Sequence, residues 1–161
     1  MPGAAPTRLD PPMSDPNLEV TVRALADKEA IRELTSRYAD CVWRHDADGA
    51  VDLFTDDAVM DVGNGTVLEG RVALRDGYRS MLTADLQPFV HGHVIELAGD
   101  RASGRCYLDL RGTMDGRSMT GAGFYEDTYV RTSCGWRFRT RKLVMRFFAP
   151  HLAGWAESGT K

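Results

Sequence analysis

Two histidines, His91 and His93, are separated by one glycine in a stretch with the pattern of a β-strand. Alternate residues of a strand share a face, so this spacing predicts that both imidazoles point to the same side. A neutral imidazole is suited to taking a proton near pH 7, which makes the pair a candidate for acid–base catalysis. The alternative is a histidine hydrogen-bonded in a pocket wall without a chemical role. As metal ligands the pair needs a third partner, and no HxxE or HxxxH pattern supplies one, so no metal site is expected.

Two tyrosines and an aspartate are further candidates for this chemistry. Tyr38 lies within an apolar stripe of a predicted helix, and Asp127 follows Tyr125 by two residues on one face of a predicted strand. A tyrosine hydroxyl and a neutral carboxylic acid in an apolar cavity can stabilise an enolate by donating hydrogen bonds to it. The alternative for Tyr38 is a core tyrosine with a satisfied hydroxyl. For Asp127 the alternative is a structural salt bridge, with Arg141 as the partner.

The elements that must position these residues are helices first and strands afterwards. Three- and four-residue spacing of apolar residues predicts a helix over Leu18–Asp46, and two shorter helices are predicted at Asp48–Phe54 and Val72–Leu82. The long helix should bury one apolar stripe, made of Leu25, Ile31, Leu34, Tyr38, Cys41, Val42 and His45.

The strands are separated by clear turn signals. A short strand at Val59–Val62 turns back through Gly63-Asn64-Gly65 to Val67-Leu68. Four long strands follow Pro88, and turn residues divide them into Phe89–Leu97, Ala102–Gly112, Ser118–Arg131 and Trp136–Phe148. Helices followed by an antiparallel meander predict an α+β fold.

Composition limits the class of protein. The chain has 161 residues with 43% apolar and 27% charged residues and a net charge of −3, which fits one globular domain and not a nucleic-acid-binding protein. Its three cysteines form no CxxC pair, which favours a reducing cytoplasm over a disulfide scaffold. No segment reaches the roughly 18 apolar residues of a membrane helix. Residues 1–16 are proline-rich and are predicted to be a disordered leader before a single domain over residues 17–155.

Several runs of sequence together resemble the SnoaL-like branch of the NTF2-like superfamily. They are LADKEAIRELTSRYADCVWRHDADGAVDLFTDDAVMDV, a later GxxAL and the run GFYEDTYVRTSCGWRFRTRKL. The resemblance implies a cone, in which a curved, mostly antiparallel mixed sheet wraps around the long N-terminal helix and opens at one end into an apolar pocket. Relatives include polyketide cyclases, scytalone-dehydratase-like enzymes, dehydrochlorinases and ketosteroid isomerases, as well as binding modules without catalysis. They transfer protons inside the cone and usually need no metal.

The resemblance assigns roles to single residues. It places His91 at the catalytic histidine of the dehydratases and dehydrochlorinases. The aspartate that pairs with that histidine in the relatives is replaced here by Trp43. Tyr38 and Asp127 match the hydrogen-bond donors of the ketosteroid isomerases, but Val62 occupies the position of their base. Each known constellation is therefore incomplete in this chain.

We therefore expect a cofactor-independent lyase or isomerase that acts on an apolar cyclic or aromatic carbonyl compound by dehydration, elimination, isomerisation or cyclisation. The catalytic candidates are His91, Tyr38, Tyr125 and Asp127. The pocket is expected to be lined by Val42, Trp43, Phe54, Met60, Val62, His93 and Met145. The alternative is a ligand-binding or dimerisation module of the same fold, and a cavity plugged by Trp43 would favour it.

Arginines alternate with other residues over Arg137, Arg139 and Arg141 in the last strand. Alternation predicts that all three share one face of the sheet. A solvated or dimer-facing surface is the expected role of that face. An isologous pair is the commonest soluble oligomer, so a homodimer is expected.

Overall fold

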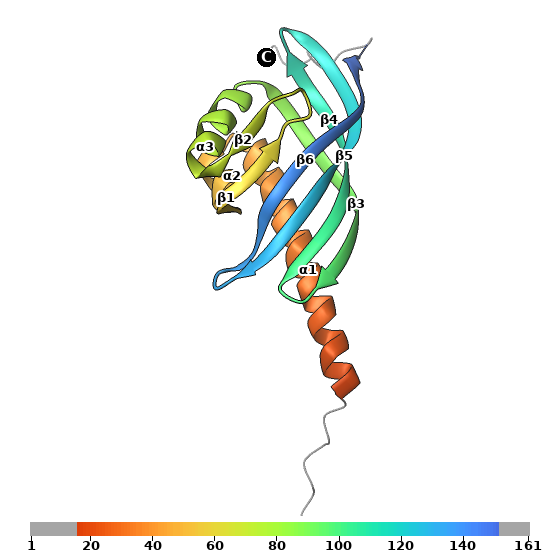
Figure 1. The fold of residues 1–161 in the computed structure, drawn as a ribbon. Coiled ribbons are helices and arrows are strands. Elements are labelled where there is room, and N and C mark those ends of the chain that lie inside the picture. The colour runs from red at the N-terminus through yellow and green to blue at the C-terminus, as the bar shows by residue number, and fades with distance from the viewer. Residues whose placement is uncertain (1–15, 152–161) are drawn as a thin grey trace, which may run out of the picture.

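A computed structural model describes residues 16–151. In this part of the chain one long helix crosses the inner face of a six-stranded sheet (Figure 1). The predicted leader falls almost entirely outside the described residues, as does the predicted end of the domain at residue 155. In chain order the elements are α1 (Pro16–Trp43), α2 (Ala47–Asp52), β1 (Phe54–Asp61), β2 (Val67–Glu69), α3 (Gly70–Met81), β3 (Asp85–Ala98), β4 (Arg101–Met114), β5 (Arg117–Thr132) and β6 (Gly135–Pro150).

The sheet is mixed and curves around α1 (Figure 1). Its strand order is β2-β1-β6-β5-β4-β3, and β3 to β6 form the predicted antiparallel meander. Within residues 16–151 only β1 and β6 run parallel, because α3 carries the chain from β2 at one edge of the sheet to β3 at the other. The α+β architecture predicted from the sequence is confirmed.

Two predicted helix ends differ from the structure. Phe54 is not helical but begins β1, because it is buried and pairs with Phe138 of β6. The long helix ends at Trp43 and not at residue 46, since His45 adopts a positive φ of 56°. Asp46 then caps α2 by accepting a hydrogen bond from the Gly49 amide.

The core lies between α1 and the concave face of the sheet. Ile31, Leu34 and Tyr38 are buried on the same side of α1, as their spacing predicted. The expectation was wrong at both ends of the stripe, since Leu25 and His45 are exposed. The first turns of α1 extend beyond the sheet, so Leu25 has no strand to pack against (Figure 1).

Candidate active site inside the curved sheet

A β-bulge at Gly92 places the two histidines on opposite faces of β3. His91 pairs with Tyr107 of β4, whereas His93 pairs with Cys106, so Gly92 is the extra residue. Gly92 has a φ of +52°, a backbone conformation that favours glycine. One extra residue reverses the alternation of a strand. The prediction that both imidazoles point to the same side is therefore wrong.

His91 faces away from α1, on the outer face of the sheet. Its imidazole is exposed and stacks on the ring of Tyr107 with 6.5 Å between the ring centroids. A base at this position does not face the interior of the cone. The histidine that does so is His93, which the sequence analysis had placed only in the pocket wall.

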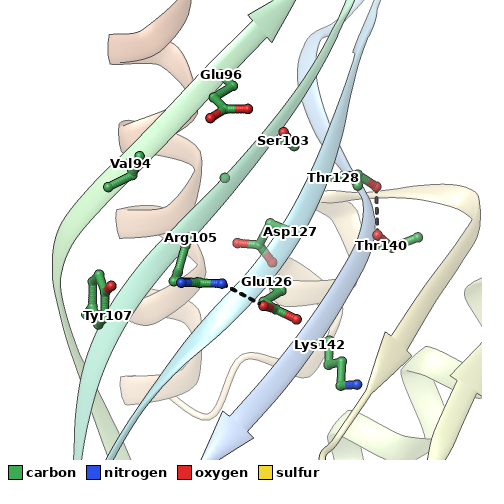
Figure 2. Close-up of a pocket in the computed structure, with 11 residues that line it drawn as sticks. Val94, Glu96, Ser103, Arg105, Tyr107, Glu126, Asp127, Thr128, Thr140 and Lys142 are labelled. Atoms are coloured by element: carbon green, nitrogen blue, oxygen red, sulfur yellow. Dashed lines mark hydrogen bonds and ion pairs between the residues drawn. The ribbon is translucent and has the colours of Figure 1, made fainter.

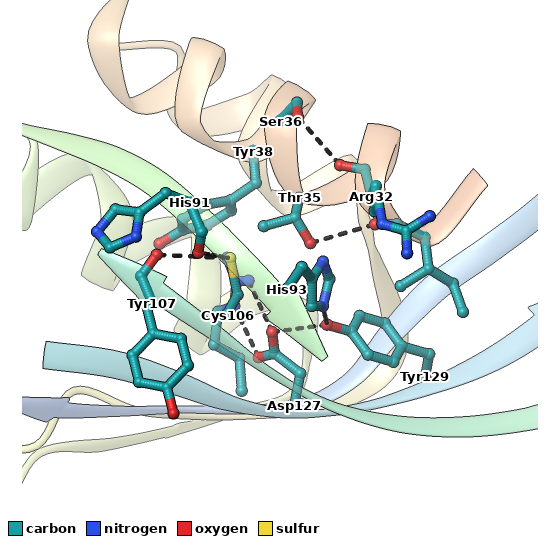
Figure 3. Close-up of polar contacts among 12 residues, drawn as sticks. Arg32, Thr35, Ser36, Tyr38, His91, His93, Cys106, Tyr107, Asp127 and Tyr129 are labelled. Carbon is teal, nitrogen blue, oxygen red and sulfur yellow. Dashed lines mark hydrogen bonds and ion pairs between the residues drawn. The ribbon is translucent and has the colours of Figure 1, made fainter. Parts of the chain in front are cut away.

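His93 is the end of a hydrogen-bonded chain, which Figure 3 shows. Its Nε2 lies 3.0 Å from the Tyr129 hydroxyl, and that hydroxyl donates to Oδ2 of Asp127 at 2.8 Å. Because Tyr129 has one hydroxyl hydrogen and Asp127 receives it, the phenol oxygen accepts from His93 Nε2–H. The neutral imidazole is then the Nε2–H tautomer, which leaves a lone pair on Nδ1.

Asp127 forms a buried ion pair with Arg141. Arg141 Nε donates to Oδ1 at 2.9 Å and Nη2 to Oδ2 at 2.8 Å, and neither side chain is exposed to solvent. The salt bridge that the sequence left open for Asp127 is thus present. Burial alone disfavours the guanidinium charge, but the Asp127 carboxylate outweighs it and holds the pKa of Arg141 well above its usual value.

The inward position of Arg141 corrects a second prediction. Arg137 and Arg139 were expected to share one outer face with it, but the register of β5 and β6 shifts between Thr128 and Tyr129. This bulge leaves Arg139 unpaired in the ladder and turns Arg141 to the interior. Arg139 instead pairs with Asp57 of β1 at 3.1 Å.

Aromatic rings enclose the Arg141 guanidinium. Its central carbon lies 4.2 Å from the ring centroid of Tyr38 and 4.0 Å from those of Tyr125 and Phe138. Tyr78 of α3 donates a hydrogen bond to the Tyr38 hydroxyl at 3.0 Å. Burial raises the pKa of both Tyr78 and Tyr125 well above the usual range, so these phenols are neutral donors. The structure thus brings together three of the four predicted catalytic residues: Tyr38, Tyr125 and Asp127.

Burial also sets the protonation of His93. Desolvation lowers the pKa of His93 to about 4, although the nearby Asp127 carboxylate acts in the opposite direction. The imidazole is therefore neutral at pH 7. Gly104 makes room for this arrangement, since a Cβ there would lie 3.2 Å from His93 Nε2 and 3.3 Å from Cε2 of Tyr129.

The residues predicted to line the pocket occupy two different depths. Phe54 and Met60 are buried in the core, whereas Val42, Val62 and Met145 are half-buried around it. Trp43 does not plug the interior. Its side chain is 45% exposed, its Nε1 donates to the Pro88 carbonyl at 2.9 Å and its ring packs edge-on against Phe89.

A hollow of about 570 Å³ on the outer face of the sheet was not predicted from the sequence (Figure 2). Its walls carry both signs of charge. Arg105 pairs with Glu126 at 2.9 Å, and Thr128 and Thr140 share a hydrogen bond of 2.7 Å. The other side chains around it are those of Val94, Glu96, Ser103, Tyr107 and Lys142. An alternation of charges along neighbouring strands was visible in the sequence, but its grouping depends on the strand register.

Sequence reasoning also missed Tyr129 as a site residue. A signal for it existed, because Tyr125, Asp127 and Tyr129 alternate along one strand and so share the inner face of β5. Within residues 16–151, no three His, Cys, Asp or Glu side chains gather in a way that would hold a metal ion. None of the helices in that range has the length and hydropathy that a membrane-spanning segment requires.

The sequence matches the family model of the SnoaL-like domain over residues 23–142. Among curated proteins none matches it. A solved structure of a candidate aromatic ring hydroxylase from Novosphingobium aromaticivorans is 29% identical, has a TM-score of 0.73 and aligns with 80% of this chain and 95% of its own.

Two further solved structures share the fold at lower identity. A candidate scytalone dehydratase from the same organism is 18% identical with a TM-score of 0.75, and the alignment covers 83% of this chain and 93% of that one. A hexachlorocyclohexane dehydrochlorinase is 20% identical with a TM-score of 0.79, and the alignment covers 87% of this chain and 99% of that one.

Proposed function

Because the chain belongs to the SnoaL-like family of the NTF2-like superfamily, we propose that it is a small-molecule enzyme that works by acid–base chemistry without a cofactor. The reaction is a dehydration, elimination, isomerisation or cyclisation of an apolar cyclic or aromatic carbonyl compound. One observation supports this best: the hydrogen-bonded chain from Arg141 through Asp127 and Tyr129 to His93. Strongly perturbed ionisable groups that are coupled in this way cluster at functional sites.

In this proposal His93 replaces His91 as the base. Its Nδ1 takes the proton, while Nε2–H stays bound to Tyr129. The positive charge that forms on the imidazole is stabilised by the Asp127 carboxylate through the Tyr129 hydroxyl. Tyr129 is a positioning residue. The hydrogen bonds from Asp127 through Tyr129 orient His93. In the relatives, an aspartate at the position of Trp43 would have this role.

The remaining predicted residues have supporting roles. The phenols of Tyr38 and Tyr125 lie beside Arg141 and are suited to donating hydrogen bonds to a substrate oxygen. Val42, Val62 and Met145 offer half-buried apolar surface to a ring. A base with a pKa of about 4 is weak, so one positioned imidazole contributes at the low end of about 10²–10⁴-fold.

Turnover of compounds handled by proteins of this fold tests the proposal. Water loss from scytalone is measured for the natural protein, for His93→Gln and for Tyr129→Phe. We expect His93→Gln to lower turnover about 100-fold, and Tyr129→Phe to lower it less. His91→Gln is the matched control, because its imidazole lies on the outer face, and it should retain full activity. Full activity in His93→Gln would contradict the assignment of the base.

A ligand-binding module is the second candidate function. Trp43 at the position of the relatives' aspartate favours it, because the usual catalytic pair is then missing. The exposed position of Trp43 favours the enzyme, because the indole does not fill the interior. Binding of ring compounds in the interior without turnover of any of them would support the module.

A further inference from the structure

In the part of the chain that the structure describes, one nitrogen of Arg141 has no hydrogen-bond partner. The guanidinium has five N–H donors, and Asp127 accepts one hydrogen bond from Nε and one from Nη2 in a two-pronged contact. Nη1 has no hydrogen-bond partner among the residues that the structure describes, although the whole side chain is buried. Both N–H donors of Nη1 thus lie in the protein interior without an acceptor among the residues that the structure describes.

The aromatic rings around Nη1 do not replace an acceptor. Tyr38, Tyr125 and Phe138 stabilise the guanidinium through their ring faces, since its carbon lies 4.0–4.2 Å from the three centroids. Contacts between N–H groups and rings are weak beside a hydrogen bond to oxygen. A buried donor left without an acceptor destabilises the folded protein, and more so when it is charged. An oxygen that arrives with a ligand would remove this penalty.

We propose that Arg141 Nη1 is the binding site for the neutral carbonyl oxygen of an aromatic ketone. The inference rests on the proposed function, because it takes the interior as the place where the substrate binds. A neutral oxygen is favoured over a carboxylate because Asp127 already balances the charge of Arg141. A second carboxylate would bring an uncompensated negative charge into the buried site.

The side chains that surround the Arg141 guanidinium are aromatic. Tyr38 and Tyr125 meet edge to face, with 5.8 Å between their centroids, and bound the guanidinium on two sides. A planar ring can pack against such edges and faces. If the carbonyl becomes an enolate during proton transfer, its oxygen gains negative charge next to Nη1. The same contact then stabilises the transition state more than the ground state.

Three naphthalene probes that differ at one substituent test the assignment. They are 2-acetonaphthone, which carries a neutral carbonyl, 2-ethylnaphthalene, which lacks it, and 2-naphthoate, which carries a carboxylate. Dissociation constants are measured by quenching of intrinsic fluorescence in the full chain. We expect the ketone to bind at least about tenfold more tightly than the hydrocarbon, as for a hydrogen bond to a charged donor. The naphthoate should bind more weakly than the ketone.

The variant must remove Arg141 without leaving Asp127 unpaired. The double substitution Asp127→Leu with Arg141→Met replaces a buried ion pair by apolar side chains, a change that often preserves folding. It should bind the ketone and the hydrocarbon equally well. Asp57→Leu with Arg139→Met is the matched control, since it removes an ion pair of the same strand at the surface, and it should keep the tenfold selectivity.

The NMR signals of the Arg141 Nη1 protons give a readout that does not depend on binding selectivity or turnover. They should shift when the ketone is added and stay unchanged with the hydrocarbon. Equal binding of ketone and hydrocarbon by the natural protein would overturn the inference. So would tighter binding of the naphthoate, or Nη1 protons that contact a bound water which the ketone does not displace. If binding is selective for the ketone but His93→Gln keeps normal turnover, the result contradicts the proposed base and leaves this binding site intact.

Discussion

At the scale of single residues, the ion pair between Asp127 and Arg141 organises the interior. Losing only one of the two side chains would destabilise the folded protein. Asp127 and Arg141 are both fully buried, and each satisfies the charge of the other. Together they orient Tyr129, and Tyr129 in turn fixes the tautomer of His93. A buried pair of this kind is weak evidence for stability, because apolar residues of similar volume often replace it without loss. We infer instead that the pair places a balanced charge in the interior and orients Tyr129.

Removing one partner should therefore lower the free energy of unfolding far more than removing both. We expect Asp127→Asn to lower the free energy of unfolding by about 3–5 kcal/mol, because the Arg141 charge is then buried without a counter-ion. The double variant Asp127→Leu with Arg141→Met should fall within about 1 kcal/mol of the natural protein or exceed it. Urea unfolding measures both. An additive loss in the double variant would show that the pair stabilises the fold.

His93 should make the stability of the protein depend on pH. Its pKa is about 4 in the folded protein and about 6.5 when unfolded, so the unfolded chain binds more protons between these values. Stability from this source is constant above pH 6.5 and is lost as the pH falls towards 4. Because His93 keeps part of its solvent contact, the loss is at most about 3 kcal/mol. Unfolding of His93→Gln in urea between pH 4 and 7 should lack this component, and an unchanged pH dependence would exclude His93 as its source.

At the scale of elements, two bulges decide which side chains reach the interior. The helices, the meander and the sheet class follow from periodicity and turn residues, and the four long predicted strands agree with the structure to within a few residues. The first strand was predicted too short, since β1 begins at Phe54 and not at Val59. Alternation alone does not give the face of each residue when one extra residue reverses it. His91 and Arg141 were both placed on the wrong side for this reason. A glycine inside a strand pattern, such as Gly92, was the one signal of a bulge available in the sequence.

The structure also shows why His93 and Tyr129 are coupled only in the folded sheet. They lie on β3 and β5, with Gly104 of β4 between them, so their contact depends on the register of three strands. No local pattern encodes that register. The residues that the sequence could identify were those whose type is rare in an interior, namely the histidines, the tyrosines and Asp127.

A methyl group at position 104 should separate this pair. A Cβ there would also lie 2.8 Å from the Val94 carbonyl, so the strands cannot absorb it without a shift. We expect Gly104→Ala to lower stability by about 1–3 kcal/mol and to break the hydrogen bond between His93 and Tyr129. NMR of the His93 ring nitrogens measures the second effect. Ser103→Ala, on the outer face of the same strand, is the control and should leave the His93 signals unchanged.

At the scale of the whole molecule, the outer face of the sheet offers enough area for pairing with a second copy. Four strands spaced about 4.8 Å apart and about 14 residues long cover about 900 Å², and a stable interface needs about 800 Å² on each partner. Val94, Tyr107 and Phe147 are exposed on this face, and the charges of the hollow in Figure 2 have both signs. A face of mixed charge can match itself across a two-fold axis.

We therefore expect a homodimer that pairs through β3 to β6. Sedimentation at micromolar concentration should give twice the mass of one chain, and Val94→Asp with Tyr107→Glu should give single chains. Val72→Asp, at an exposed residue of α3, should leave the dimer intact. A monomer at these concentrations in the natural protein would contradict the expectation.

We have inferred that His93 is a neutral base whose tautomer is fixed by Tyr129 and Asp127. The most direct test is a titration of the His93 ring nitrogens by ¹⁵N NMR in the full chain, with Tyr129→Phe measured alongside. The account predicts an Nε2–H tautomer in the natural protein, neutral at pH 7 and titrating near pH 4, and a mixture of tautomers in Tyr129→Phe. An Nδ1–H tautomer, or a His93 pKa above about 6.5, would contradict it.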